Sequence, residues 1–276
     1  MGDGINDAPV LRQSDVAISV NNATEIAKDA SDIILLEKSL LVLEKGIIQG
    51  RTIFGNILKY IKITTASNFG DALSVLIGTV WLPFSPMAPA QILLQNLIYD
   101  FSQFGVALDR VDATFLTSPQ RWQSKDLLPF TTINGTISTF FDLITFAIAG
   151  YYFGYINSYN SAIAQNDSLL AAQSLARFHA CWFIIGLLSQ TFVFQILRTE
   201  QLPVIQSRST WPVYVIGALA TIMAFSIVYI SQIGSLVQLQ SPGLIYIRIS
   251  IAIIFSYCLT AQLTKVGYKK VFKKWL

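Results

Sequence analysis

The stretch PVYVIGALATIMAFSIVYIS, residues 212–231, contains no charged side chain. A helix of this length measures about 30 Å, which matches the hydrocarbon core of a bilayer. Hydrophobic residues make up 53% of the 276 residues and charged residues only 13%, whereas soluble domains carry about 25% charged residues. The composition therefore predicts an integral membrane protein and argues against a disordered chain or a coiled coil.

Five further stretches approach the length that a membrane span requires. The fold class that we expect is a mainly α-helical membrane protein with six transmembrane helices, at residues 63–82, 87–108, 130–155, 179–197, 212–231 and 244–263. We expect residues 46–62 to form a stalk helix that runs without a breaker into the first span. Residues 63–265 then form the membrane domain, and 266–276 form a basic tail.

Lysine and arginine gather on one side of these spans. The connecting segments on that side contain Lys45, Arg51, Lys59, Lys62, Arg110, Arg121, Lys125, Arg198, Arg208, Lys265, Lys269, Lys270, Lys273 and Lys274. In the connecting segments on the other side, Arg177 is the only basic residue. Because basic loops stay in the cytoplasm, both ends of the chain are predicted to be cytoplasmic. The basic tail is expected to contact anionic lipid headgroups, and a formal net charge of +3 is too small to suggest a nucleic-acid partner.

Residues 1–45 differ from the rest and are typical of a piece of a soluble α/β domain. A β-type run at 16–20 is followed by a predicted helix at about 24–31 and a second apolar run at 33–36. This length is too short to bury a core of its own. We therefore expect that the sequence begins inside a domain and that Met1 need not be a natural start.

The first residues form a loop that combines glycine with acidic side chains. Asp3 and Asp7 are four residues apart and can approach one Mg²⁺, a cation that prefers oxygen ligands and usually shares them with phosphate. Gly4 leaves the backbone open to an anion, and the amide of Asn6 can donate to a phosphoryl oxygen. By spacing alone an ordinary Asx turn explains the loop equally well.

The longer string GDGINDAP (residues 2–9), followed by SDVAI (14–18), closely resembles the hinge motif of the P-type cation-transporting ATPases. These proteins have a phosphorylation domain with the α/β fold of the haloacid-dehalogenase-like phosphotransferases. The resemblance implies that Asp3, Asn6 and Asp7 are catalytic, that Asp3 and Asp7 hold the catalytic Mg²⁺, and that Gly4 and Asn6 contact the phosphoryl group. It also implies ATP and Mg²⁺ as the cofactors of the complete pump.

The resemblance extends through the six predicted spans, which look like the last six membrane helices of such a pump. QNLIYD (95–100), SPQRW (118–122) and LLSQT (187–191) are most similar to the bacterial magnesium-transporting subclass. One departure matters, because the family's phosphorylated aspartate in the Asp-Lys-Thr-Gly-Thr motif has no match in this sequence. The chain is therefore expected to be a C-terminal part of a plasma-membrane pump, inactive without its N-terminal part.

Several polar residues lie inside the predicted spans. An acidic side chain at the bilayer centre costs about 2.5–3.5 kcal/mol on insertion scales, so such groups should face the bundle interior. Asn68 and Asp71 share one helical face, and Asn96 and Asp100 share another. Together with Asp142, these residues are the candidate ligands of a transported cation. Asn68 and Asp100 are the strongest candidates. Asp142 could equally hold helices together, and Asp71 could instead be protonated against a neighbouring helix.

Oxygen ligands suit Mg²⁺, Ca²⁺ or Na⁺ better than a soft metal. The residues permit a divalent cation, and only the resemblance selects magnesium. A pump for another cation such as calcium stays open as an alternative. A channel or secondary transporter also stays open, although the sequence contains no convincing internal repeat of the kind such transporters carry.

Overall fold

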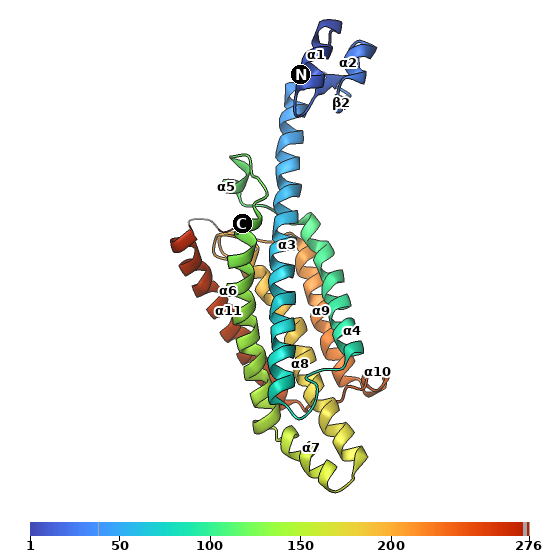
Figure 1. Ribbon diagram of the computed structural model, residues 1–276, viewed down its shortest axis with the longest axis vertical. Coiled ribbons are helices and arrows are strands. Elements are labelled where there is room, and N and C mark those ends of the chain that lie inside the picture. Colours follow the sequence, from blue (N-terminus) through green and yellow to red (C-terminus); the bar gives the residue numbers. More distant parts are fainter. Residues whose placement is uncertain (38, 273–274, 276) are drawn as a thin grey trace. The chain divides into compact units, whose positions relative to one another are not determined.

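The computed structural model describes residues 1–37, 39–272 and 275 (Figure 1). The chain divides into two compact units, Met1–Phe54 and Gly55–Leu276. The long helix α3, Leu40–Trp81, contributes residues to both units.

The first unit contains two short parallel strands, β1 (Ile18–Val20) and β2 (Ile33–Leu35), which pair Ile18 with Ile33. A parallel pair needs a crossover connection, and helix α2 (Glu25–Asp29) lies in that connection. Helix α1 (Ala8–Gln13) precedes β1 and follows a single 3-10 turn at Ile5–Asp7. β1 and α2 agree in type with the run at 16–20 and the helix at about 24–31 that the sequence predicts, and β2 falls in the second apolar run, whereas α1 is not predicted. Their buried core is small and consists of Leu11, Ala17 and Ala27.

The second unit is a helical bundle (Figure 1). Its helices after α3 are α4 (Pro89–Gln103), α5 (Ala113–Leu116), α6 (Ser124–Ala147), α7 (Tyr155–Ala164), α8 (Ser168–Leu197), α9 (Trp211–Tyr229), α10 (Ser231–Leu236) and α11 (Ile245–Phe272). A 3-10 segment, Phe104–Leu108, follows α4, and a π-helical turn, Ile148–Tyr152, extends α6.

Helix α8 is the centre of this bundle and packs against α4, α6, α7, α9 and α11. Every residue from Phe178 to Gln190 is buried. A helix that is apolar on all sides is stable only when other helices cover all of its faces, and the sequence of α8 meets that condition. Around it, α3 and α6 approach closely at Gly70 and Gly135. A Cβ atom added to Gly135 would lie 2.9 Å from the backbone oxygen of Ala66.

The connecting segments meet at two opposite ends of the bundle. At one end, Lys59 of α3 contacts Asp109, and Arg198 contacts the same carboxylate. At the other end, the side chain of Gln91 donates to the backbone of Val237, and His179 contacts the backbone oxygen of Ser85. The basic and the weakly charged connections therefore separate as the sequence predicts.

Among the described residues, four helical segments are long and apolar enough to cross a membrane: Ser124–Tyr152, Ser168–Leu197, Trp211–Tyr229 and Ile245–Phe272. They correspond to the last four predicted spans. The first two predicted spans lie in α3, whose C-terminal half carries Asn68 and Asp71, and in α4, which has only 15 residues. The polar side chains of α3 and the short length of α4 explain why these two helices are not among the four apolar segments.

Several predicted boundaries differ from the observed ones. Helix α8 begins at Ser168 instead of residue 179, because Gln173 and Arg177 lower the local hydropathy without breaking a helix. The Asp167 side chain caps this start and accepts hydrogen bonds from the backbone N–H groups of Leu169 and Leu170. Helix α11 likewise continues to Phe272, through basic residues that the sequence places in the tail. Of that tail, Lys273 and Lys274 lie outside the described residues.

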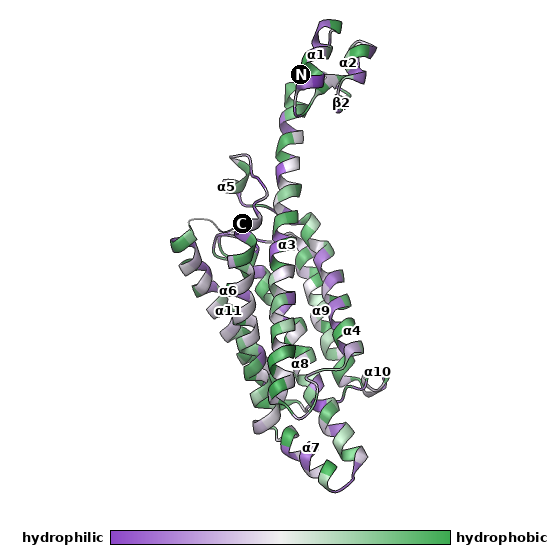
Figure 2. Ribbon diagram, in the orientation of Figure 1, coloured by the Kyte–Doolittle hydropathy of each residue, from purple (hydrophilic) through white to green (hydrophobic). Residues whose placement is uncertain are grey.

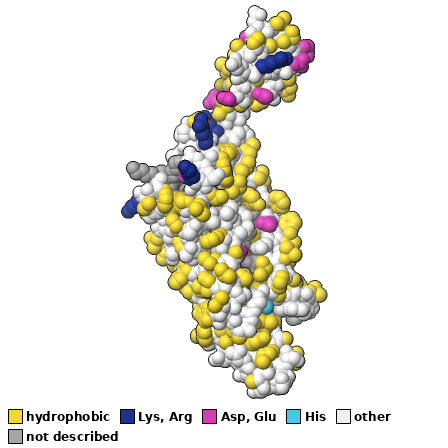
Figure 3. Space-filling model, in the orientation of Figure 1, with side chains coloured by type: hydrophobic (Ala, Val, Ile, Leu, Met, Phe, Trp, Pro, Cys, Tyr) yellow, Lys and Arg dark blue, Asp and Glu magenta, His cyan; other side chains and the backbone are white. Residues whose placement is uncertain are grey.

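Figure 2 shows green, apolar residues along α6, α8 and α9. On the face drawn in Figure 3, hydrophobic side chains cover much of the bundle, whereas many of the charged side chains belong to the first unit. An apolar patch of this extent on a protein surface marks a membrane or protein contact.

Candidate functional site

The front turn is ordered by the side chain of Asp7. Its Oδ2 atom accepts hydrogen bonds from the backbone N–H groups of Asp3 and Gly4, each at 2.9 Å. The backbone of Gly2 donates to Ile18 of β1, and the Ser19 hydroxyl donates to the Gly2 oxygen. A Cβ atom on Gly2 would lie 2.5 Å from Cβ of Asp7, so a larger residue would displace that carboxylate. The Asp7 carboxylate therefore closes the turn backward onto the two residues that precede the 3-10 segment, and Gly2 fixes the turn to β1.

The sequence-predicted residues of the turn have different surroundings. Asp3 and Asn6 are exposed, whereas Gly4 and Asp7 are partly buried. No group of three or more His, Cys, Asp or Glu side chains suited to a metal ion occurs among the residues that the structure describes. Two carboxylates and an exposed amide still fit Mg²⁺, because this ion usually keeps several waters and takes further oxygens from a phosphate. Asp3 and Asp7 are the residues of this turn that would hold it.

Asp71 is the first of the predicted acidic residues inside the bundle. Its Oδ2 atom accepts a hydrogen bond of 2.8 Å from Nε2 of Gln190, which connects α3 to α8. The Oε1 atom of Gln190 is buried and has no hydrogen-bond partner. This pair therefore holds two helices together and also leaves one acceptor oxygen available to a cation or water.

Asp142 on α6 is 2% exposed and has two side-chain partners. Its Oδ1 atom accepts from Nε1 of Trp182 on α8 at 3.0 Å, and its Oδ2 atom lies 2.6 Å from the Ser74 hydroxyl on α3. Because three helices meet at this carboxyl group, its arrangement is typical of a helix-to-helix contact.

Asn68 and Asp100 do not face the interior of this chain. Both are exposed, although the sequence predicts them to be the strongest inward-facing ligands. Helical spacing predicts which residues share a face, but spacing cannot tell which face the neighbouring helices cover. Asn96 is partly buried, and its Oδ1 atom has no hydrogen-bond partner. The five candidate ligands are therefore not brought together inside the bundle formed by this chain.

Other buried polar groups in the bundle are not among the ligands that the sequence predicts. Buried oxygens without a hydrogen-bond partner include Oε1 of Gln95, Oε1 of Gln103 and Oγ1 of Thr64. A cavity of about 20 Å³ lies between Ser67, Tyr99, Asn134 and Gln190, and a volume of this size accommodates about one water molecule. The sequence feature that could have predicted these buried polar groups is the recurrence of glutamine at 91, 95 and 103 in α4.

A buried ion cluster at one end of the bundle is a further feature that the sequence does not predict. Nζ of Lys59 lies 2.9 Å from Oδ2 of Asp109, and a nitrogen of Arg198 lies 2.8 Å from the same oxygen. All three side chains are at most 1% exposed. Burial lowers the pKa of Lys59, while the charge of Asp109 acts in the opposite direction. The cluster connects α3 to the segments that follow α4 and α8.

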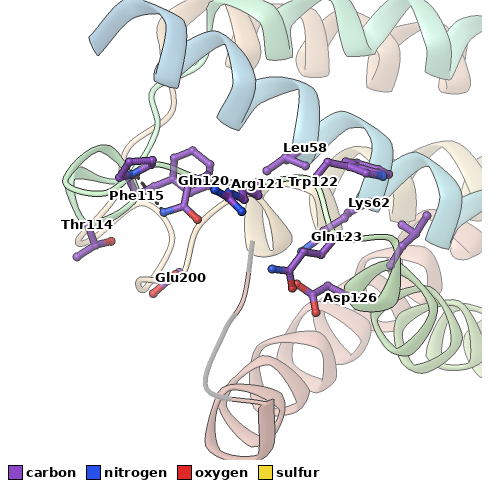
Figure 4. A pocket seen from close by; sticks show the side chains of 12 residues that line it. Leu58, Lys62, Thr114, Phe115, Gln120, Arg121, Trp122, Gln123, Asp126 and Glu200 are labelled. Carbon is purple, nitrogen blue, oxygen red and sulfur yellow. Dashed lines mark hydrogen bonds between the residues drawn. The ribbon is translucent and has the colours of Figure 1, made fainter. Parts of the chain in front are cut away.

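Beside this cluster lies a cavity of about 390 Å³ (Figure 4). Its lining combines Lys62 of α3, Arg121 and Trp122 of the segment before α6, and the acidic residues Asp126 and Glu200. Because basic and acidic side chains occur together, the lining favours neither a strongly anionic nor a strongly cationic ligand.

The chain is similar to known transport proteins. A family model described as "Cation transporting ATPase, C-terminus" matches residues 84–267. The Magnesium-transporting ATPase, P-type 1, of Salmonella typhimurium is 46% identical over the whole chain, and the protein of that name from Escherichia coli is 43% identical over 98% of it. Calcium-transporting ATPase 1 of Bacillus cereus is 32% identical over 63% of the chain. The matched region spans 29%, 28% and 21% of these three relatives.

Proposed function

Because the chain belongs to the family of cation-transporting ATPase C-terminal regions, we propose that it is the C-terminal part of an ATP-driven magnesium transporter. The observation that carries the proposal is the identity of 46% along the full chain to a relative named as a magnesium-transporting P-type ATPase. The front turn supports it independently, because it carries two carboxylates and an exposed amide and is hydrogen-bonded to the parallel strand β1 and to Thr24, which follows that strand.

In this proposal, residues 1–45 are a piece of a phosphorylation domain with the haloacid-dehalogenase-like fold. Asp3 and Asp7 hold the catalytic Mg²⁺, and Gly4 and Asn6 contact the phosphoryl group. When bound, the ion neutralises charge on the phosphate that reacts. The contribution of this chain is to orient the site, because the Asp7 side chain fixes the backbone of Asp3 and Gly4. The phosphorylated aspartate and the ATP site belong to the N-terminal part of the pump.

We further propose that the bundle is the membrane domain, with α3 and α4 as its first two spans and with both ends of the chain in the cytoplasm of a bacterial cell. The meeting of the basic connections at one end of the bundle supports this orientation. Two polar helices are acceptable as spans when other helices of the pump cover their polar faces.

The transported cation is proposed to bind beside α3 and α4. Asn68, Asp71, Asn96 and Asp100 are the ligands that this chain offers. The exposure of Asn68 and Asp100 fits this role if the membrane helices of the N-terminal part pack on that face and add their own oxygen ligands. Oδ1 of Asn96 on α4 and Oε1 of Gln190 on α8 are buried oxygens without a hydrogen-bond partner, and they are further possible ligands.

A functional assay separates this proposal from its alternatives. The gene for the complete protein, including the sequence before residue 1, is expressed in a bacterium that lacks its own magnesium transporters. We expect growth at low magnesium, and loss of that growth when the aspartate of an upstream Asp-Lys-Thr-Gly-Thr motif is changed to asparagine. Rescue that survives this change would indicate a channel or secondary transporter. Absence of rescue together with ATP-driven calcium transport would indicate a calcium pump.

A further inference from the structure

The carboxyl group of Asp142 lies at the junction of three helices, and its surroundings allow the hydrogens to be counted. Oδ1 accepts from Nε1–H of Trp182 at 3.0 Å. Oδ2 lies 2.6 Å from Oγ of Ser74, and the same Oγ lies 2.8 Å from the backbone oxygen of Gly70. Oδ2 of Asp142, Oγ of Ser74 and the backbone oxygen of Gly70 therefore form a chain with two short contacts.

Two separate hydrogen bonds between three oxygens need two hydrogens. The serine hydroxyl has one, and the carbonyl of Gly70 has none because it only accepts. If Asp142 were ionised, one of the two contacts would join two acceptors without a hydrogen between them. A carboxylic acid supplies the second hydrogen: its O–H donates to Ser74, Ser74 donates to Gly70, and Trp182 donates to Oδ1.

The charges nearby agree with this count. Among the residues that the structure describes, the titratable groups that face Asp142 are Asp71 of α3 and Tyr257 of α11, and neither carries a positive charge. From α8 the group receives the indole N–H of Trp182, which is a neutral donor. An ionised carboxylate at this buried position would therefore lack a compensating cation, whereas a neutral acid with all of its hydrogen bonds made carries little desolvation cost.

We infer that Asp142 is a neutral carboxylic acid that positions α3, α6 and α8 relative to one another and does not bind the transported cation. The first half of this inference rests on the hydrogen-bond geometry and the charges nearby, and the second half rests on the proposed function. A neutral acid that donates through one oxygen and accepts through the other has little to offer a cation. Asp142 is accordingly a positioning residue, unlike Asp71.

The decisive variant is Asp142→Asn, because an amide reproduces one donor and one acceptor in the same places. In the complete pump we expect its thermal midpoint and its half-saturating Mg²⁺ concentration for transport to stay within about twofold of the wild type. Asp142→Ala removes both partners and should lower the midpoint clearly. If Asp142→Asn instead raised the half-saturating concentration by about tenfold or more at an unchanged midpoint, the group would be a cation ligand and the inference would be wrong.

Infrared spectroscopy tests the proton directly and does not depend on transport. The complete pump should show a carbonyl stretching band of a protonated carboxylic acid that disappears in Asp142→Asn. Identical spectra in that region would overturn the inference. Asp71→Asn is the matched control for transport, with an expected rise of about tenfold or more in the half-saturating Mg²⁺ concentration. If Asp71→Asn left it unchanged, the proposed cation site would fail, while the infrared result would still decide the state of Asp142.

Discussion

At the scale of single residues, Gly135 on α6 marks a place where two helices leave no room for a side chain. A Cβ atom there would lie 2.5 Å from Cδ1 of Phe69 and 2.9 Å from the Ala66 oxygen. Gly135→Ala should therefore destabilise the protein by about 1–3 kcal/mol through overpacking, as measured by thermal unfolding in detergent. Gly267→Ala is the matched control, because its Cβ atom meets nothing within 4 Å. The expected effect of that control is neutral or slightly stabilising, since alanine is the better helix former. Equal losses in both variants would contradict the close contact between α3 and α6.

Single residues also show where prediction from the sequence ends. The three-residue spacing of Asn68 and Asp71 predicts a shared polar face, whereas in the structure Asp71 contacts Gln190 and Asn68 is exposed. Periodicity fixes which residues share a face, but the direction of that face depends on neighbouring helices that are distant in sequence. The same limit applies to Lys59 and Asp109. Both belong to segments outside the predicted spans, and only tertiary packing brings them together in a buried pair.

At the scale of helices and strands, the apolar runs predict the type of each element well and its ends less well. The runs at 16–20 and 33–36 become β1 and β2, and the apolar stretches become the long helices of the bundle. The start of α8 at Ser168 was missed because a hydropathy window follows composition, whereas a helix ends only where its backbone is broken or capped. The short connecting helices α7 and α10 are absent from the prediction for a similar reason, since few of their residues are apolar enough to mark a span.

The cluster that joins α3 to the segments after α4 and α8 should also matter for stability. Asp109→Asn leaves Lys59 and Arg198 buried without their shared carboxylate, and removal of one partner of a buried ion pair costs about 3–5 kcal/mol. Glu200→Gln is the control, because the Glu200–Lys269 pair is partly exposed and such pairs contribute about 0–1 kcal/mol. Chemical denaturation of both variants in detergent measures the difference. A loss in Asp109→Asn no larger than that in the control would show that the cluster contributes little to the bundle.

At the scale of the whole molecule, the central structural element is the unbroken helix α3, Leu40–Trp81. In the proposed pump it transmits movement of the phosphorylation domain to Asn68 and so gates the cation site. Insertion of four glycines between Gly50 and Gly55 of the complete pump should preserve ATP hydrolysis and abolish the ion transport that accompanies it, since glycine interrupts a helix. Four alanines at the same place keep the helix and should retain more of the coupling. Equal coupling in the two variants, measured as ions transported per ATP hydrolysed, would argue against this role of α3.

The most direct test of the account is ATP-driven Mg²⁺ transport by the complete pump in reconstituted vesicles, measured for the wild type and for Asp100→Asn. The account predicts that the wild type transports Mg²⁺ in preference to Ca²⁺ and that Asp100→Asn raises the half-saturating Mg²⁺ concentration by about tenfold or more. A wild type that hydrolyses ATP without moving Mg²⁺, or an Asp100→Asn variant with unchanged Mg²⁺ dependence, would contradict it.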